Sequence, residues 1–133
     1  MIEIQEIMET SVITVTKDTP IYDAIGIMVA NNITGLPVVD DDMNLAGIIS
    51  EKDVLDLLYN FRDKPGTVAD FMTADVVSFT IHDSLTDVAA SFRDNFFRRV
   101  PIVSDGKLVG IISRRDIIKY IARQRKEEKS SAL

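Results

Sequence analysis

A chain of 133 residues with 46% hydrophobic and 27% charged residues is long enough to bury the core of one domain and short for two independent ones. It has no cysteine and one histidine, His82, which excludes a disulfide framework or a thiolate metal site and argues against a histidine-rich one. The 21 acidic and 15 basic residues give a formal net charge of -6, which disfavours nonspecific attraction to nucleic acid or to an anionic membrane.

The N-terminal segment MIEIQEIMET carries acidic residues where a signal peptide carries basic ones. No apolar run is long enough to span a bilayer. We expect a cytoplasmic protein that neither spans nor binds a membrane.

An internal repeat organises the rest of the chain, because residues 4–58 align with residues 68–121. Met8 falls on Met72 and Pro37 falls on Pro101. After a one-residue gap in a turn, the sequence GIIS of the first copy falls on GIIS of the second.

Each copy is predicted to fold as strand, helix, strand, strand, helix. The β-prone sequences VITVT (12–16) and VVSFT (76–80) indicate the first strands. Thr19-Pro20 and Asp83-Ser84 indicate the helix starts, with Pro20 at a first helical position. Both helices carry apolar residues at i, i+3, i+4 and i+7, so one face of each is expected to lie on a core.

Two short strands around an acidic turn follow in each copy, in GLPVVDDDMNLAGIIS (35–50) and RVPIVSDGKLVGIIS (99–113). The pair Asp105-Gly106 favours a tight hairpin turn. The prolines 37 and 101 have no backbone N–H and are expected at a strand start or an edge-like position. Closing helices are expected from Glu51 and from Arg114.

The predicted fold class is α+β, with two pseudo-symmetric β-α-β-β-α repeats packed through their sheets into one module. The expected boundaries are 1–59 for the first repeat, 60–67 for the linker, 68–123 for the second repeat and 124–133 for a charged tail into which the last helix frays. One such repeat buries little surface by itself, so two are expected to pack together and to create two related clefts at their junction.

The motif Gly-Ile-Ile-Ser-x-x-Asp closes both repeats, at residues 47–53 and 110–116. Its glycine lets another backbone or a ligand approach closely. Its serine and aspartate stand where a helix begins, and a hydroxyl with a carboxylate there can bind a ribose diol. The same two residues also resemble a capping box. Duplication copies caps as faithfully as sites, so the motif by itself leaves both interpretations open.

Taken together, these motifs resemble paired cystathionine-β-synthase (CBS) domains, the Bateman module that senses adenosine nucleotides. The resemblance covers nearly the whole chain and rests on the lead-ins IQEIMETSVITVT and VADFMTADVVSFT, the segments ITGLPVVD and RRVPIVSD, and the two GIISxxD closings. It implies a regulatory module that is not an enzyme and requires no cofactor. The implied ligand is AMP, ADP, ATP or an S-adenosyl compound, and the implied assembly is a disc-shaped homodimer built through the helices, which transmits occupancy to an effector protein.

The resemblance also implies two sets of binding residues, in which the serine and the aspartate hold the ribose, first-strand and apolar residues of the other repeat hold the base, and basic residues meet phosphate. For the primary cleft these are Ser113, Asp116, Arg98, Arg99, Ile13, Thr14 and Ile33. For the secondary cleft they are Ser50, Asp53, Val77, Ser78 and Phe97.

The arginine pair of the primary cleft is replaced by Thr34 and Gly35 in the first repeat. Because a guanidinium suits phosphate oxygens, the primary cleft is expected to bind the adenine nucleotide. The secondary cleft is expected to bind weakly, to take a neutral adenosyl compound, or to stay empty. A solvated basic pair is the alternative for these arginines.

The other candidate residues do not indicate a catalytic or metal-binding site. The run 40–42 of aspartates lacks the alternate-residue spacing of a calcium loop and is expected to be a solvated turn, so no metal site is predicted. No Ser-His-Asp set and no phosphate-binding GxxxxGK[ST] loop occurs. Arg114 and Arg115 lie at a helix start, where the macrodipole disfavours cations, so an anionic partner and plain exposure both stay open.

Two rival functions remain beside the sensor. One is a ligand-free dimerisation or protein-interaction module in which the GIISxxD residues are only helix caps. The other is nucleic-acid binding by the arginine pair and the basic face of the last helix, which the net charge and the lack of interleaved aromatic residues disfavour.

Overall fold

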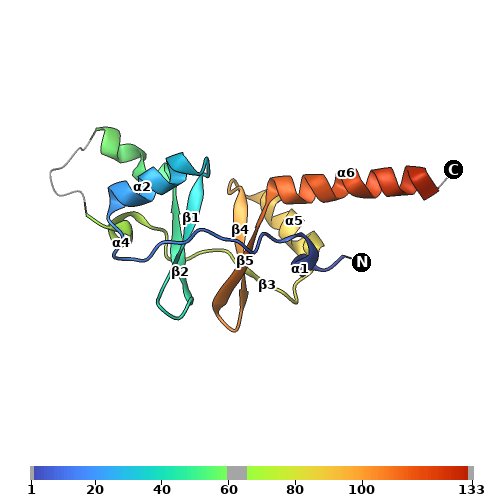
Figure 1. The fold of residues 1–133 in the computed structure, drawn as a ribbon, viewed down its shortest axis with the longest axis horizontal. Coiled ribbons are helices and arrows are strands. Elements are labelled where there is room, and N and C mark those ends of the chain that lie inside the picture. Colours follow the sequence, from blue (N-terminus) through green and yellow to red (C-terminus); the bar gives the residue numbers. More distant parts are fainter. Residues whose placement is uncertain (1, 60–65, 132–133) are drawn as a thin grey trace. The chain divides into compact units, whose positions relative to one another are not determined.

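The computed structural model describes residues 2–59 and 66–131, which divide into two structural units (Figure 1). The first unit holds residues 13–59, 66–76 and 106–108, and the second holds residues 2–12, 77–105 and 109–131. Each unit therefore combines the helices of one sequence repeat with the start of the lead-in segment of the other.

The first unit contains the helix α2 (Ile21–Ala30), the strands β1 (Gly35–Val39) and β2 (Leu45–Ser50), and the short helices α3 (Glu51–Val54), η1 (Leu55–Leu58, a 3-10 helix) and α4 (Val68–Phe71). The strands β1 and β2 pair antiparallel, with a register shift between Val38 and Val39. The predicted apolar stripe of α2 faces the core, which also takes residues from both strands and from α4. Its fully buried members include Ile21, Ala24, Leu36, Val38, Ile49 and Val68.

The second unit contains α1 (Ile4–Ile7), β3 (Phe79–Thr80), α5 (Leu85–Asp94), β4 (Arg99–Ser104), the main part of β5 (Lys107–Ser113) and α6 (Arg114–Ser131). Its sheet has the order β3-β4-β5, and β3 is parallel to β4. The turn between β4 and β5 is the predicted tight one, since Asp105 and Gly106 both have positive φ angles, 54° and 79°. The buried core residues are Ile4, Leu85, Val88, Phe92, Val100, Ile102, Ile112 and Ile117.

The first strand of each repeat is much shorter than predicted. VITVT forms no strand, and Val15 alone pairs with Val38 in a single parallel bridge. VVSFT contributes only the two residues of β3. In the first repeat Val15 is the one residue of the lead-in that bonds to β1, donating its N–H to the Pro37 carbonyl at 3.1 Å and accepting from the Val39 N–H at 2.9 Å.

The two hairpin prolines lie inside their strands. Pro37 and Pro101 are the third residues of β1 and β4, so the expectation of a strand start is wrong. The alternative, an edge-like position, fits Pro37. Its backbone faces Val15, where the lead-in makes a single bridge, so its missing N–H removes no hydrogen bond from the β1–β2 ladder.

The closing helices begin at Glu51 and Arg114, as predicted, but they differ in length. The first has four residues and continues as η1, whereas α6 has 18 residues and stays helical through Ser131. The charged segment expected to fray is therefore helical over residues 124–131, because Arg, Gln, Lys and Glu are good helix formers and neither Gly nor Pro interrupts them.

The other helix starts lie close to their predicted places. Ser84 caps α5 by accepting from the Asp87 N–H at 3.2 Å. Pro20 is predicted at the first helical position of α2 but is its N-cap, so the helix begins one residue later, at Ile21. The short helices α1 and α4 are not predicted, although Thr67 and Asp70 form a capping box at α4 whose T-x-x-D signal is visible in the sequence. Residues 60–65 of the predicted linker lie outside the described residues. No described helix is long and apolar enough to cross a membrane.

Candidate ligand-binding site

The closing motif of the second repeat forms a reciprocal helix cap. Ser113 ends β5, and its N–H donates to Asp116 Oδ2 at 2.8 Å. The Asp116 N–H donates to Ser113 Oγ at 3.1 Å. Both side chains are half-buried at the start of α6. The capping interpretation is therefore correct for the structure of this motif.

The closing motif of the first repeat forms the same capping box and adds one hydrogen bond to it. The Ser50 N–H donates to Asp53 Oδ2 at 2.9 Å, and the Ser50 hydroxyl donates to the same oxygen at 3.0 Å. In the second repeat the Ser113 hydroxyl accepts from the Asp116 N–H and donates no hydrogen bond within the described residues, so its own proton stays available. The two motifs therefore present different donors at equivalent places.

Capping and ligand binding do not exclude each other in these motifs. Each capping bond to Asp53 and to Asp116 uses Oδ2, and Oδ1 of either carboxylate accepts no hydrogen bond within the described part of the chain. A carboxylate has two oxygens and about four acceptor positions. The cap thus holds the carboxylate in one orientation and leaves one oxygen for a further donor.

In each repeat, the segment before the hairpin is hydrogen-bonded to the start of the closing helix. The Arg114 N–H donates to the Arg98 carbonyl at 2.9 Å, and in the first repeat the Glu51 N–H donates to the Thr34 carbonyl at 3.0 Å. Arg98 is exposed. Arg99, the first residue of β4, is half-buried, and its Nε is buried without a hydrogen-bond partner among residues 2–59 and 66–131. The structure therefore brings the arginine pair to the end of the hairpin that carries Ser113.

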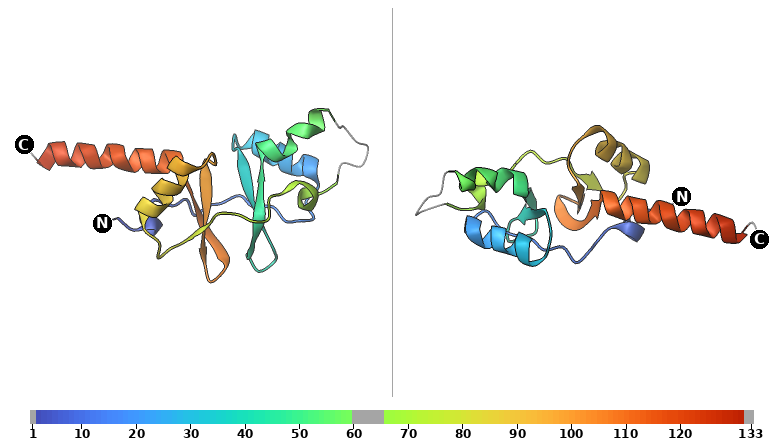
Figure 2. Two further views of the ribbon diagram at one scale, coloured as in Figure 1. Left: turned by 180° about the vertical axis from the view of Figure 1, so that it is seen from behind. Right: turned by 90° about the horizontal axis from the view of Figure 1, so that it is seen from above.

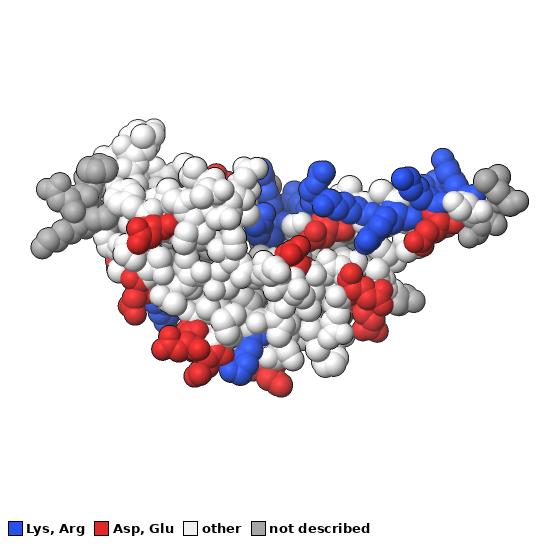
Figure 3. Space-filling model, in the orientation of Figure 1, with Lys and Arg blue, Asp and Glu red and all other residues white. Residues whose placement is uncertain are grey.

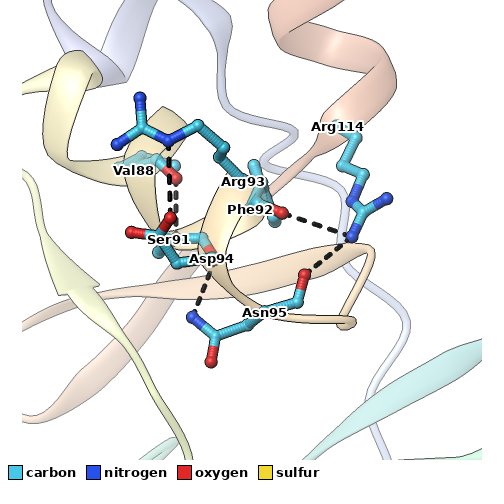
Figure 4. A network of polar contacts seen from close by, with 7 residues as sticks. All are labelled: Val88, Ser91, Phe92, Arg93, Asp94, Asn95 and Arg114. Carbon is cyan, nitrogen blue, oxygen red and sulfur yellow. Dashed lines mark hydrogen bonds and ion pairs between the residues drawn. The ribbon is translucent and has the colours of Figure 1, made fainter.

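Arg114 has a structural role that sequence reasoning left open (Figure 4). Its Nη2 donates to the Phe92 carbonyl at 3.3 Å and to the Asn95 carbonyl at 2.9 Å, and its Nε donates to the Phe97 carbonyl at 3.2 Å. These carbonyls belong to the end of α5 and the loop after it, where a helix leaves carbonyl groups without partners. Arg114 therefore ties the start of α6 to the end of α5.

The remaining predicted site residues are divided between the units. In the first unit Ile13 is 40% exposed, Thr14 is half-buried, and Ile33 packs against the core. In the second unit Val77 and Ser78 are exposed. Phe97 packs against the core of that unit and meets Phe92 edge to face, with ring centroids 6.0 Å apart. Each predicted set thus draws residues from both units.

The glycine of each closing motif lies against the backbone of another segment, with no space for a side chain. A Cβ atom on Gly110 would lie 2.6 Å from Met8 Sδ and 3.0 Å from the Glu9 carbonyl oxygen. Glu9 and Ile111 exchange two backbone hydrogen bonds, of 2.8 and 2.9 Å. Gly47 has the Thr73 carbonyl oxygen in the equivalent place, 2.5 Å from a built Cβ. Of the two roles considered for these glycines, the structure thus shows the approach of another backbone.

The acidic turn of the first hairpin is a solvated turn held by one aspartate. Asp40 accepts hydrogen bonds from the backbone N–H of Asp42 and from both the backbone N–H and the side chain of Asn44. The Asn44 side-chain hydrogen bond is the largest cause of a pKa of Asp40 below its usual value. His82 is exposed. Within the described residues no three His, Cys, Asp or Glu side chains are grouped to hold a metal ion.

Comparison with known proteins relates the chain to one family. The CBS domain family matches residues 4–60 and 68–123. The uncharacterized protein MJ1225 of Methanocaldococcus jannaschii is 40% identical over 118 residues, which cover 89% of this chain and 42% of that protein. The chain therefore spans less than half the length of this relative.

Two solved structures of CBS pairs have the same fold. The crystal structure of CBSX2 in complex with AMP superposes with a TM-score of 0.86 at 28% identity, covering 94% of this chain and 99% of that one. The CBS domain pair of MJ0100 in complex with 5′-methylthioadenosine and S-adenosyl-L-methionine gives 0.80 at 26% identity, covering 93% and 98%. The predicted α+β class is confirmed, and the chain belongs to the CBS domain family as a tandem pair of CBS repeats.

Proposed function

We propose that this chain is a non-catalytic regulatory module that binds an adenosine-type ligand, namely AMP, ADP, ATP or an S-adenosyl compound, and transmits its occupancy to a partner protein. Two CBS pairs with the same fold support this proposal, because one was crystallised with AMP and the other with two adenosyl compounds. The similarity covers almost the whole of this chain.

The observation that carries the proposal is the oriented carboxylate of Asp116. Its Oδ2 is held by the Ser113 N–H at 2.8 Å, while its Oδ1 has no donor within the described residues. The Ser113 hydroxyl still has a proton to donate, because within the described residues it accepts a hydrogen bond from the Asp116 N–H and donates none. A carboxylate oxygen and a hydroxyl donor side by side match the vicinal hydroxyls of a ribose.

Arg98 and Arg99 are the proposed phosphate ligands of this primary site. The buried Nε of Arg99 lacks a partner among the described residues, and a buried polar atom without a partner is costly. A phosphate oxygen would supply the missing acceptor and match the guanidinium charge. Ile13, Thr14 and Ile33 are the proposed contacts of the base.

The secondary site consists of Ser50, Asp53, Val77, Ser78 and Phe97. Here the Ser50 hydroxyl already donates to Asp53, and Thr34 and Gly35 offer no positive charge. We expect this site to bind weakly, to take a neutral adenosyl compound, or to stay empty.

Signalling follows from thermodynamic linkage. A ligand that contacts both repeats shifts the equilibrium between their possible arrangements, and the size of the shift equals the difference in its binding free energy for those arrangements. A partner protein that binds one arrangement more tightly than another then responds to the ligand. The proposed assembly is a homodimer through the helices, the proposed location is the cytoplasm, and no cofactor is required.

A thermal-shift panel tests the proposal with a matched pair of variants. AMP, ADP, ATP, GTP, NAD and S-adenosylmethionine are compared on the wild type, Asp116→Ala and Asp53→Ala. Both variants lose a helix-cap carboxylate, which costs about 1 kcal/mol, so both should unfold at a lower temperature without ligand. A ligand at about a hundred times its Kd should add about 2.7 kcal/mol to the wild type and to Asp53→Ala, and little to Asp116→Ala.

Three outcomes would contradict parts of the proposal. If no compound shifts the wild type, the interaction-module alternative replaces the sensor. If both variants lose the shift equally, the sites are equivalent. If Arg99→Gln binds AMP as tightly as the wild type does, the arginine has no role in phosphate binding.

A further inference from the structure

The basic residues of α6 gather on one side of the helix. At 100° per residue, the seven arginine and lysine side chains fall within half of the helix circumference. They are Arg114, Arg115, Lys119, Arg123, Arg125, Lys126 and Lys129. Figure 3 shows Lys and Arg side chains gathered along α6. We call this half of the helix the basic face.

None of the seven charges of the basic face forms an ion pair within the described residues, although the Arg114 guanidinium donates hydrogen bonds to backbone carbonyls. All seven side chains are exposed, and the only ion pair among the described residues, Arg93 with Asp94, lies on α5. Like charges also stand four residues apart, as in Lys119 with Arg123 and Arg125 with Lys129. Such pairs oppose each other, so an external anion would relieve a repulsion that the helix carries.

The second half of α6 extends beyond the rest of its unit (Figures 1 and 2). Ile117 packs into the core, but residues 121–130 are exposed except for Gln124, which is half-buried. No large apolar residue follows Ile121 in the helix. The part of the helix beyond Ile121 has no apolar stripe to insert into lipid, so its basic residues fit a water-exposed anionic partner.

The charge of the chain is divided unevenly, which limits the size of that partner. The helix α6 has seven basic and three acidic residues, a net charge of +4, while the whole chain has -6, which leaves -10 for the remainder. Charges are screened over about 8 Å at physiological ionic strength. A short acidic segment on the second half of α6 meets mainly the basic face, whereas a long nucleic-acid duplex would also meet the acidic remainder.

We propose that the basic face of α6 binds an acidic segment of a partner protein. Apart from Arg114 and Arg115, which lie between Ser113 and Asp116, the residues of the basic face are outside the proposed adenosine site, so the proposal does not depend on ligand binding. The proposal rests on charge complementarity. The exposed cations lie on one side of a helix that extends beyond its unit, and they form no ion pairs among the described residues.

The test measures binding of a fluorescent 18-residue poly-L-glutamate peptide to the intact chain at low salt. The peptide has the same number of residues as α6. The test variant carries Arg115→Gln, Lys119→Gln, Arg123→Gln and Lys126→Gln. Glutamine keeps a high helix propensity, and far-UV circular dichroism checks that the fold is retained. We expect about tenfold weaker binding, because four exposed ion pairs are lost, and weaker wild-type binding as salt is raised.

A control variant removes two positive charges outside α6. Lys17→Gln with Lys52→Gln changes two exposed lysines outside α6 and should bind the peptide as the wild type does. Absence of wild-type binding at low salt, or equal binding by the α6 variant, overturns the proposal. Tighter α6-dependent binding to duplex DNA or to phosphatidylserine vesicles than to poly-L-glutamate also overturns it, in favour of that other class of partner.

Discussion

The aspartate of each closing motif makes its capping hydrogen bonds through one carboxylate oxygen. Asp116 and Asp53 both orient a helix start through Oδ2, and both leave Oδ1 available. The difference between them lies in the neighbouring serine, whose hydroxyl is free to donate at Ser113 and already donates at Ser50. One pattern in the sequence therefore yields two different hydrogen-bond arrangements.

The turn aspartate Asp40 makes stability depend on pH. Its hydrogen bonds, chiefly from the Asn44 side chain, lower its pKa below the ordinary value of 3.8. The folded state thus favours the ionised carboxylate. The stabilisation is present above the ordinary pKa and is lost as pH falls through the lowered value. We expect Asp40→Ala to lower the melting temperature at neutral pH and to lower it progressively less as pH falls below 3.8.

Asp41→Ala is the control for this measurement. Asp41 is exposed in the same turn and accepts no hydrogen bond among the described residues. Its removal changes the charge equally but breaks no turn contact. Equal losses of melting temperature in both variants at neutral pH would attribute the effect to charge and not to the turn.

The local sequence predicts helix caps and tight turns better than it predicts the extent of strands. The α5 cap at Ser84 and the turn at Asp105-Gly106 follow from residues within a few positions, and both were predicted. The lead-in strands were overestimated, because β-prone residues such as those of VITVT become a strand only where a neighbouring strand pairs with them. Here Val15 has one such bridge.

The contact of a lead-in with a closing strand gives a test of packing. Gly110→Ala would place a Cβ 2.6 Å from Met8 Sδ and 3.0 Å from the Glu9 carbonyl oxygen, so the segment must shift. We expect a loss of about 1–3 kcal/mol in the free energy of unfolding, measured by urea denaturation.

Gly26→Ala is the matched control, since nothing lies within 4 Å of a Cβ at this position in α2. Alanine in a helix interior should raise stability by about 0.5–1 kcal/mol. An unchanged stability of Gly110→Ala would show that the lead-in adjusts without cost.

The two cores of the molecule are each assembled from both repeats. Ile4 from the start of the chain is buried in the second unit, with 1% of its surface exposed, and Val68 from the start of the second repeat is fully buried in the first unit. A repeat cut out of the chain therefore lacks part of its own core and gains an exposed apolar segment.

We expect residues 68–133 produced alone to unfold at a lower temperature than the whole chain, because Ile4 is missing from their core. Thermal circular dichroism measures this, and a peptide of residues 1–12 added in excess should raise the melting temperature. The same peptide with Ile4→Ser should not. A fragment as stable as the whole chain would show that the lead-in is dispensable.

The repeat, the helix starts, the hairpins and the GIISxxD residues could be read from the sequence, because each depends on neighbours in the chain or on a regular spacing. The family followed from their order. Which lead-in bonds to which strand, the lengths of the closing helices, and the use of Arg114 at the end of α5 could not, because these depend on segments far apart in the chain. Such contacts form only when folding brings distant backbone groups together, and no local pattern encodes their partners.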